Sequence, residues 1–135
     1  MLSYETISPH TLELLKGLMA EPMFASLRLV GGTALALQYG HRSSIDLDFF
    51  GEITEDAEDI KDVLRKYGKL LVIKESKNIK IYQLDGVKID FVNYSYPWID
   101  DAVIDDGITL ASPRDIAAMK INAIEEKKKK KDFID

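Results

Sequence analysis

The dipeptide Asp85-Gly86 lies between two strand-like segments and predicts a β-hairpin. In the flanking segments, residues 79–84 and 87–92, apolar side chains alternate with polar ones. This period of two directs successive side chains to opposite faces of a sheet, so that one face can be buried. A sheet that contains this hairpin is therefore the starting point for the fold.

Helix signals are interspersed with the strand signals along the chain. Ser8-Pro9 and Ser112-Pro113 each predict a helix start, with serine as the N-cap and proline at the first helical position. We expect helices from Ser8 to Glu21, over 33–39, from Thr54 to Gly68 and from Ser112 onward, and strands over 27–30, 46–50, 70–73, 79–84 and 87–92.

These elements predict one α/β (α+β) domain with a mixed β-sheet flanked by helices, and 135 residues suffice to build it. Residues 70–73 should form a buried strand, and residues 94–106 a loop. The packing side of the last helix should consist of Ala117, Ala118, Ile121 and Ile124. The sequence stops at Asp135 inside that helix and without a cap, which suggests a truncated C-terminus.

Charge and composition exclude several classes of protein. A formal net charge of −5 gives no global attraction to nucleic acid or to an anionic membrane, so a polyanionic partner would have to meet a local patch. The absence of cysteine excludes disulfides, thiolate zinc sites and cysteine nucleophiles. Since the sequence has neither a signal-peptide pattern nor an apolar run long enough for a membrane span, we expect a cytoplasmic protein.

Three aspartates at strand positions predict a metal site. Asp46 and Asp48 alternate with apolar residues, which places both on one face of a strand with their Cα atoms about 6–7 Å apart. Asp90, between Ile89 and Phe91, lies on the second arm of the hairpin. Mg2+ prefers oxygen ligands, and clustered carboxylates are unfavourable without a cation. We therefore expect these three aspartates to bind Mg2+, or Mn2+ in its place.

A glycine turn precedes these strands and predicts a phosphate-binding site. Gly31 and Gly32 follow a short strand and directly precede a helix, whose first N–H groups and dipole favour anions, and Thr33 could add a hydroxyl there. The turn and the aspartates together suit nucleotidyl transfer, which needs positioning and charge neutralisation at the α-phosphorus. Taken singly, the glycines have a common structural explanation as a tight turn, and Asp46 and Asp48 as a solvated strand face.

Two blocks of the chain resemble the AbiEii/AbiGii toxin family of nucleotidyltransferases, which belongs to the DNA polymerase β-like superfamily. They are residues 31–37 with 41–49 (GGTALAL and HRSSIDLDF) and residues 111–124 (ASPRDIAAMKINAI). The resemblance continues through Ile89-Asp90-Phe91 and residues 131–135, so it covers nearly the whole chain. It implies a nucleotidyltransferase fold and Mg2+-dependent use of a nucleoside triphosphate. It also implies the role of toxin in a bacterial toxin–antitoxin or phage-defence pair, with an antitoxin protein as partner.

The resemblance also implies residue roles by position. Gly31 and Gly32 would seat the triphosphate. Asp46 and Asp48 would bind both metal ions. Asp90 would bind the catalytic metal and help to deprotonate the attacking hydroxyl.

The outer positions of the site have alternative explanations. By the same resemblance Lys120 would lie near the phosphates and Asp132 would match the family's C-terminal Lys-Asp motif, although Lys120 could instead extend along its helix surface. Arg42 could pair with a triphosphate oxygen, orient Asp46 or form a surface salt bridge. Lys127 stands where family members often carry arginine, and it lacks the forked grip of arginine on phosphate. The basic run at 125–131 is either a solvated helix end or a contact for tRNA.

Two functions from different classes stay open at this point. The chain is either an enzyme that moves a nucleotidyl group to an acceptor hydroxyl, on RNA such as tRNA or on protein, or a non-catalytic binding or regulatory module of the same fold. The three aspartates favour the enzyme, because like charges held together are costly without a use. A metal-dependent phosphoesterase is disfavoured, because such sites usually need histidines and the chain has only 2.

Overall fold

The chain folds around one mixed, seven-stranded sheet in the computed structural model, which describes residues 2–40 and 46–121. From edge to edge the strands are β3 (Leu70–Glu75), β4 (Ile79–Leu84), β5 (Val87–Asn93), β2 (Leu47–Gly51), β1 (Arg28–Val30), β7 (Ile108–Leu110) and β6 (Val103–Asp105). The β2–β5 and β1–β7 pairs are parallel, and the other neighbours are antiparallel. The predicted fold class is confirmed.

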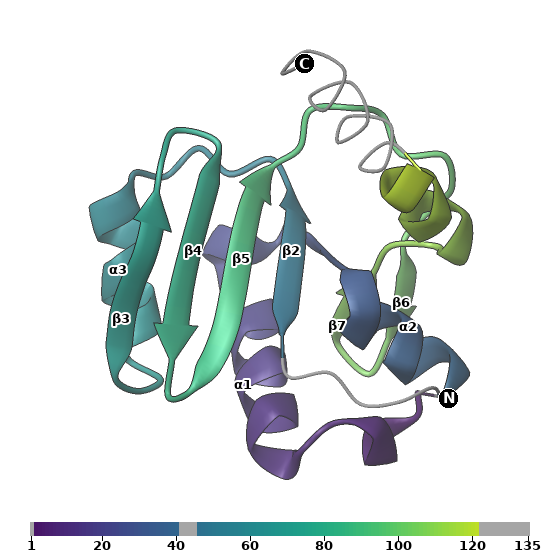
Figure 1. Ribbon diagram of the computed structural model, residues 1–135, viewed down its shortest axis with the longest axis horizontal. Coiled ribbons are helices and arrows are strands. Elements are labelled where there is room, and N and C mark those ends of the chain that lie inside the picture. Colours follow the sequence, from purple (N-terminus) through teal and green to yellow (C-terminus); the bar gives the residue numbers. More distant parts are fainter. Residues whose placement is uncertain (1, 41–45, 122–135) are drawn as a thin grey trace, which may run out of the picture.

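Helices cover one face of this sheet and part of the other. The helices α1 (Pro9–Ala20) and α3 (Ala57–Arg65) lie behind the strands in Figure 1, whereas α2 (Gly31–Tyr39) contacts β1 and β2. Short 3-10 turns, η1 (Tyr4–Thr6) and η2 (Pro22–Phe24), flank α1, and a last helix occupies residues 113–121. Within the described residues, no helix covers the near face of β3, β4 and β5 (Figure 1), and none is long and apolar enough to cross a membrane.

The core lies between the sheet and the helices behind it. Alternate residues of the central strands are buried there, namely Leu47 and Phe49 on β2 and Ile89 and Phe91 on β5. The ring of Phe91 stacks on that of Phe49 at 5.5 Å and on that of Phe24 at 5.0 Å between centroids. The intervening residues of β2 and β5 therefore face the opposite, open side of the sheet.

Local chemistry sets the helix starts. Ser8 and Ser112 cap their helices as predicted, because each hydroxyl accepts a hydrogen bond from an N–H of the first turn. The cap of α3 differs from the prediction. It is Asp56 and not Thr54, since the Asp56 carboxylate accepts the hydrogen bond of the Asp59 N–H.

The prediction that residues 70–73 form a buried strand is wrong. These residues belong to β3, an edge strand whose Leu71, Val72 and Ile73 side chains are 51%, 50% and 56% exposed. Among the described strands β3 pairs with β4 alone, and the register between them shifts between Val72 and Lys74. An apolar run alone cannot distinguish such an edge from a central strand, because the difference lies in its neighbours.

The prediction that residues 94–106 form a loop is wrong in part, because this segment contains the strand β6. The strands β6 and β7 form a second hairpin around Asp106-Gly107, with φ angles of 50° and 77°. These angles match those at Asp85-Gly86, 50° and 84°, where the predicted hairpin is confirmed. The Asp-Gly signal was thus present at both turns.

The last helix packs through a different side from the predicted one. Ile116 is buried and Met119 partly so, whereas Ala117 and Ile121 are exposed. The cap residue Ser112 is itself buried, so the residues that follow it at helical spacing turn to the core. The predicted packing residue at position 124 lies outside the described residues.

Candidate functional site

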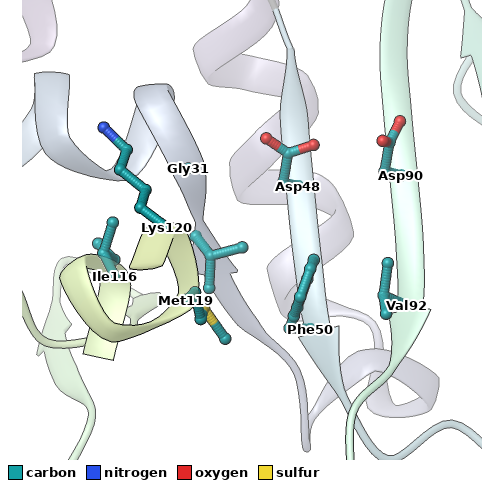
Figure 2. Close-up of a pocket in the computed structure, with 9 residues that line it drawn as sticks. Gly31, Asp48, Phe50, Asp90, Val92, Ile116, Met119 and Lys120 are labelled. Carbon is teal, nitrogen blue, oxygen red and sulfur yellow. The ribbon is translucent and has the colours of Figure 1, made fainter. Parts of the chain in front are cut away.

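Asp48 and Asp90 lie side by side on the open face of the sheet. The strands β2 and β5 run parallel, and the two aspartates are partners in their register. Each alternates with buried residues of its strand, so its side chain leaves the core. Figure 2 shows the two carboxylates next to each other. The structure therefore brings these two predicted site residues together.

Burial and repulsion make this pair of carboxylates costly without a cation. Burial, and then the charges of Asp90 and Asp46, raise the pKa of Asp48 to about 6, while Lys88 opposes the shift. Burial also raises the pKa of Asp90 against the pull of Lys88. Within the described residues, the Oδ1 atom of Asp90 is buried without a hydrogen-bond partner. A buried carboxylate oxygen without a partner fits a site that gains stability from a bound cation.

The third predicted acid, Asp46, immediately precedes β2. Its charge raises the pKa of both Asp48 and Asp90, so it lies within electrostatic reach of the pair. Across residues 2–40 and 46–121, however, no group of three His, Cys, Asp or Glu side chains is arranged to hold a metal ion. The described site is a carboxylate pair with a third acid nearby, and a three-aspartate metal site stays a prediction.

Gly31 opens α2 directly against the Asp48 carboxylate. Its φ angle is 76°, and a Cβ atom added there would lie 2.4 Å from Oδ2 of Asp48. Only glycine tolerates both the backbone conformation and the close approach. The N-cap of α2, Val30, gives the first turn no side-chain hydrogen bond, and Gly32 in that turn is exposed. An exposed helix start without a side-chain cap favours an anion.

Thr33 does not lie where the sequence predicted. It is fully buried, and its hydroxyl donates a hydrogen bond to the carbonyl oxygen of Asp46. The hydroxyl therefore joins α2 to the residue before β2 and does not face the site. Arg42 and Asp132, also predicted to bind the nucleotide, lie outside the described residues, as does the basic run at 125–131.

A cavity of about 240 Å³ opens beside the two carboxylates. Its polar lining consists of Gly31, Asp48, Asp90 and Lys120. The rest of its wall is apolar and consists of Val30, Phe50, Val92, Ile116 and Met119. In Figure 2 the ammonium group of Lys120 extends away from the carboxylates. A ligand with one anionic and one apolar part suits this lining.

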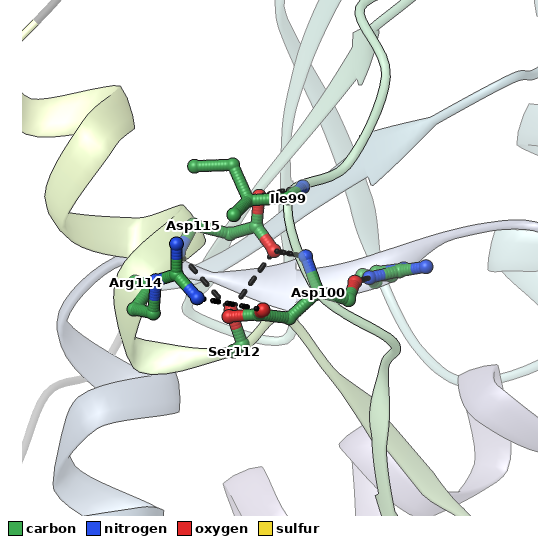
Figure 3. Close-up of polar contacts among 6 residues, drawn as sticks. Ile99, Asp100, Ser112, Arg114 and Asp115 are labelled. Carbon is green, nitrogen blue, oxygen red and sulfur yellow. Dashed lines mark hydrogen bonds and ion pairs between the residues drawn. The ribbon is translucent and has the colours of Figure 1, made fainter.

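Asp115 anchors the helix that carries Lys120. Its carboxylate accepts hydrogen bonds from the N–H groups of Ile99 (2.8 Å) and Asp100 (3.1 Å) and lies 2.9 Å from the Ser112 hydroxyl (Figure 3). Burial alone would raise the pKa of Asp115, but these hydrogen bonds hold it below its usual range. The helix is thereby fixed to the loop that follows β5, and one wall of the cavity is fixed with it.

Several residues at the site were not predicted from the sequence. Lys88 precedes Asp90 by two residues, and its Nζ atom lies 3.6 Å from Oδ2 of that aspartate. Phe50 and Val92 follow Asp48 and Asp90 at the same spacing and line the cavity. Strand alternation would have placed these three residues on the face of the aspartates. No such local signal exists for Ile116 and Met119, which come from a distant helix.

Comparison with known proteins identifies the family. The family model described as "Nucleotidyl transferase AbiEii toxin, Type IV TA system" matches residues 13–135. The chain belongs to this family. This AbiEii family member is also 40% identical over 111 residues to an uncharacterized protein, aq_aa25, of Aquifex aeolicus (strain VF5). The match covers 79% of the chain and 54% of that protein, so the chain spans about half the length of its relative.

Solved structures show the same fold. A candidate nucleotidyltransferase from Thermotoga maritima (TM1012) has a TM-score of 0.61 at 18% identity, over 95% of the AbiEii chain and 94% of its own. JHP933 from Helicobacter pylori has a TM-score of 0.57 at 19% identity, over 84% of the AbiEii chain and 57% of its own. At these identities the likeness shows the nucleotidyltransferase fold alone.

Proposed function

We propose that this AbiEii family member is a Mg2+-dependent nucleotidyltransferase. It would move a nucleotidyl group from a nucleoside triphosphate to an acceptor hydroxyl, with RNA such as tRNA as our candidate acceptor. The observation that carries the proposal is the pairing of Asp48 with Asp90 in register, directly beside the backbone of Gly31. Membership of a nucleotidyltransferase family supports the same function.

The residues at the site fit Mg2+, or Mn2+ in its place. Carboxylate oxygens are the ligands that these ions prefer, and Oδ1 of Asp90 lacks another partner among the described residues. Asp48 and Asp90 would hold the ion, with Asp46 as a third ligand. Such an ion would neutralise charge on the phosphates and acidify the acceptor hydroxyl.

The side chains and backbone of the site would perform the other parts of the reaction. The acceptor oxygen forms a bond to the α-phosphorus while the bond from that phosphorus to the pyrophosphate oxygen breaks. We assign the acceptor proton to Asp90, whose carboxylate lies beside that of Asp48 on the open face of the sheet. The first turn of α2, at Gly31 and Gly32, would bind the triphosphate through backbone N–H groups.

We also propose a biological role. The family description supports a toxin of a toxin–antitoxin pair, with a cognate antitoxin protein as its partner and phage defence as the benefit to the host. We place this action in the cytoplasm, because nucleoside triphosphates and tRNA are found there.

Labelled transfer tests the activity. The protein is incubated with Mg2+, each α-labelled nucleoside triphosphate and total RNA, and label should appear in RNA. Asp48→Asn and Asp90→Asn should each lower the rate by about 100-fold or more, because each removes a charge that stabilises the transition state. Asp101→Asn removes the same charge from an exposed position and should leave the rate unchanged. Expression of the wild type, but not of Asp48→Asn, should arrest bacterial growth.

Other results would change the proposal in defined ways. Label on protein instead of RNA would keep the reaction and correct the acceptor. If no label is transferred and nucleotide binding is the same in wild type and Asp48→Asn, the chain is a non-catalytic binding module.

A further inference from the structure

Lys88 lies on the open face of the sheet next to the acidic pair. It precedes Asp90 by two residues on β5, so both side chains leave the strand on the same side. The Nζ atom is 3.6 Å from Oδ2 of Asp90, and the lysine side chain is 44% exposed against 20% for the aspartate. The ammonium group therefore reaches the more buried carboxylate from the solvent side.

The surroundings of Lys88 leave the acids as its electrostatic partners. Its register partner on β4 is Gln83, which carries no charge, and the partner of Gln83 on β3 is Leu71. Within residues 2–40 and 46–121, Lys88 is the one cation paired with Asp90. Its charge also acts on Asp48, where it opposes the repulsion from Asp90 and Asp46. The ammonium group of Lys88 thus partly neutralises the charges of both Asp90 and Asp48.

The ion pair is long and partly exposed. At 3.6 Å it exceeds the distance of a strong hydrogen bond. Ion pairs open to solvent contribute little to stability, so a stronger competitor for the carboxylate can displace the lysine. A divalent cation bound by Asp48 and Asp90 is such a competitor, since it carries twice the charge and needs the same oxygen atoms.

We infer that Lys88 is a positioning residue that acts as the built-in counter-ion of Asp90, and that a divalent cation must displace its ammonium group in order to bind. The inference rests on the proposed function, because it presupposes that Asp48 and Asp90 hold the ion. Lys88 keeps the Asp90 side chain aligned with Asp48 before the ion arrives. The same charge lowers the affinity of the site for the ion.

Binding of Mn2+ alone to the whole chain, followed by electron paramagnetic resonance, tests this role without any turnover. Lys88→Met should bind Mn2+ roughly tenfold more tightly than the wild type, because it removes a like charge next to the ion. Lys88→Arg keeps the charge and should remain within about twofold of the wild type. Lys77→Met, in the exposed turn between β3 and β4, makes the same change in net charge away from the site and is the matched control.

A second readout is thermal unfolding without metal. Lys88→Met should have a lower melting temperature than Lys77→Met, because the acids lose their counter-ion. Added Mn2+ should raise the melting temperature of Lys88→Met more than that of Lys77→Met. Equal or weaker Mn2+ binding by Lys88→Met than by Lys77→Met would overturn the inference. If Lys88→Met does not fold, Lys88→Gln makes the same comparison.

Asp48→Asn distinguishes this inference from the proposed function. If Asp48→Asn binds Mn2+ as tightly as the wild type, the metal site itself is wrong and both proposals fail. If Asp48→Asn loses Mn2+ while Lys88→Met matches its control, the metal site stands and only the role of Lys88 is wrong.

Discussion

At the scale of single residues, the geometry of the site requires a residue without a Cβ atom at position 31. Gly31 has no Cβ, and the Asp48 carboxylate occupies the space where that atom would lie. Its positive φ angle is a second requirement for glycine. The glycine therefore does more than form a turn, since it lets the start of α2 approach the carboxylate.

Gly31→Ala should destabilise the protein through both requirements. A positive φ angle at alanine costs roughly 1–3 kcal/mol, and contact with Asp48 should add to this loss. Gly107→Ala is the matched control, because its φ angle is 77° and its added Cβ meets nothing within 4 Å. Urea unfolding of both variants measures the difference. If both variants lose the same free energy of unfolding, the Cβ at position 31 does not clash with Asp48. In an Asp48→Ala background, the additional loss of Gly31→Ala over Gly107→Ala should disappear.

The sequence predicted the residues of the site unequally. Asp48 and Asp90 followed from strand alternation, which depends only on the residues next to them in the chain. Thr33 was misplaced because α2 begins at Gly31 and not at Thr33. This earlier start turns Thr33 inward, and the glycine conformation that permits the start cannot be read from residue order.

At the scale of elements, local signals located the strands and helices but not their surroundings. The Asp85-Gly86 hairpin and the caps at Ser8 and Ser112 depend on nearby atoms, and all were predicted. The exposure of β3 was not predicted, because it depends on which strands and helices lie next to β3 in the folded protein. The strands β6 and β7 were missed although Asp106-Gly107 marks the turn between them, because segments of 3 residues are too short to show alternation.

The helix at 113–121 should depend strongly on Asp115. An asparagine there keeps one acceptor oxygen, whereas the carboxylate accepts from both the Ile99 and Asp100 N–H groups. One of these partly buried N–H groups then loses its partner, and Asp115→Asn should lower the free energy of unfolding by roughly 1–3 kcal/mol. Chemical denaturation measures this loss.

Arg114→Met is the control for that variant. The Arg114 side chain is 74% exposed in its 3.2 Å ion pair with Asp100, so its loss should cost about 1 kcal/mol or less. If the two variants lose the same stability, the Asp115 hydrogen bonds do not hold the helix.

At the scale of the whole molecule, the acidic site lowers the free energy of unfolding at neutral pH. The folded protein holds Asp48, Asp90 and Asp46 within electrostatic reach of one another, and their burial and repulsion raise the pKa of Asp48. In the unfolded chain the same groups are separated and solvated. The free energy of unfolding therefore decreases as Asp48 and Asp90, whose pKa values are raised in the folded protein, ionise.

This loss of stability should depend on pH. The pKa of Asp48 is about 6 in the folded protein against an ordinary 3.8, so the folded state retains a proton that the unfolded chain has released. Stability due to this group is greatest below about pH 4, falls as the pH rises through about 6, and stays low above it. Asp48→Asn escapes this loss and should become more stable than the wild type by roughly 1–3 kcal/mol near neutral pH without metal.

Urea unfolding from about pH 4 to pH 8 in EDTA tests this prediction. Carboxylates with a lowered pKa, such as Asp115, make stability rise with pH instead. They are present in both the wild type and Asp48→Asn, so their contribution cancels when the free energies of unfolding of the two proteins are subtracted. Asp101→Asn, which removes the same charge at an exposed position, is the matched control. A constant difference between Asp48→Asn and the wild type over this range would contradict the assigned pKa.

The parallel pairing of β2 with β5 has a consequence for how the molecule matures. The helix α3 and the strands β3 and β4 all lie between these two strands in the sequence. Joining them requires a large loop to close, which is slow and entropically costly compared with a local hairpin. The pairing of Asp48 with Asp90 therefore requires that this long-range strand pair has formed, and the metal site proposed above would be absent from a chain that has not yet joined β2 to β5.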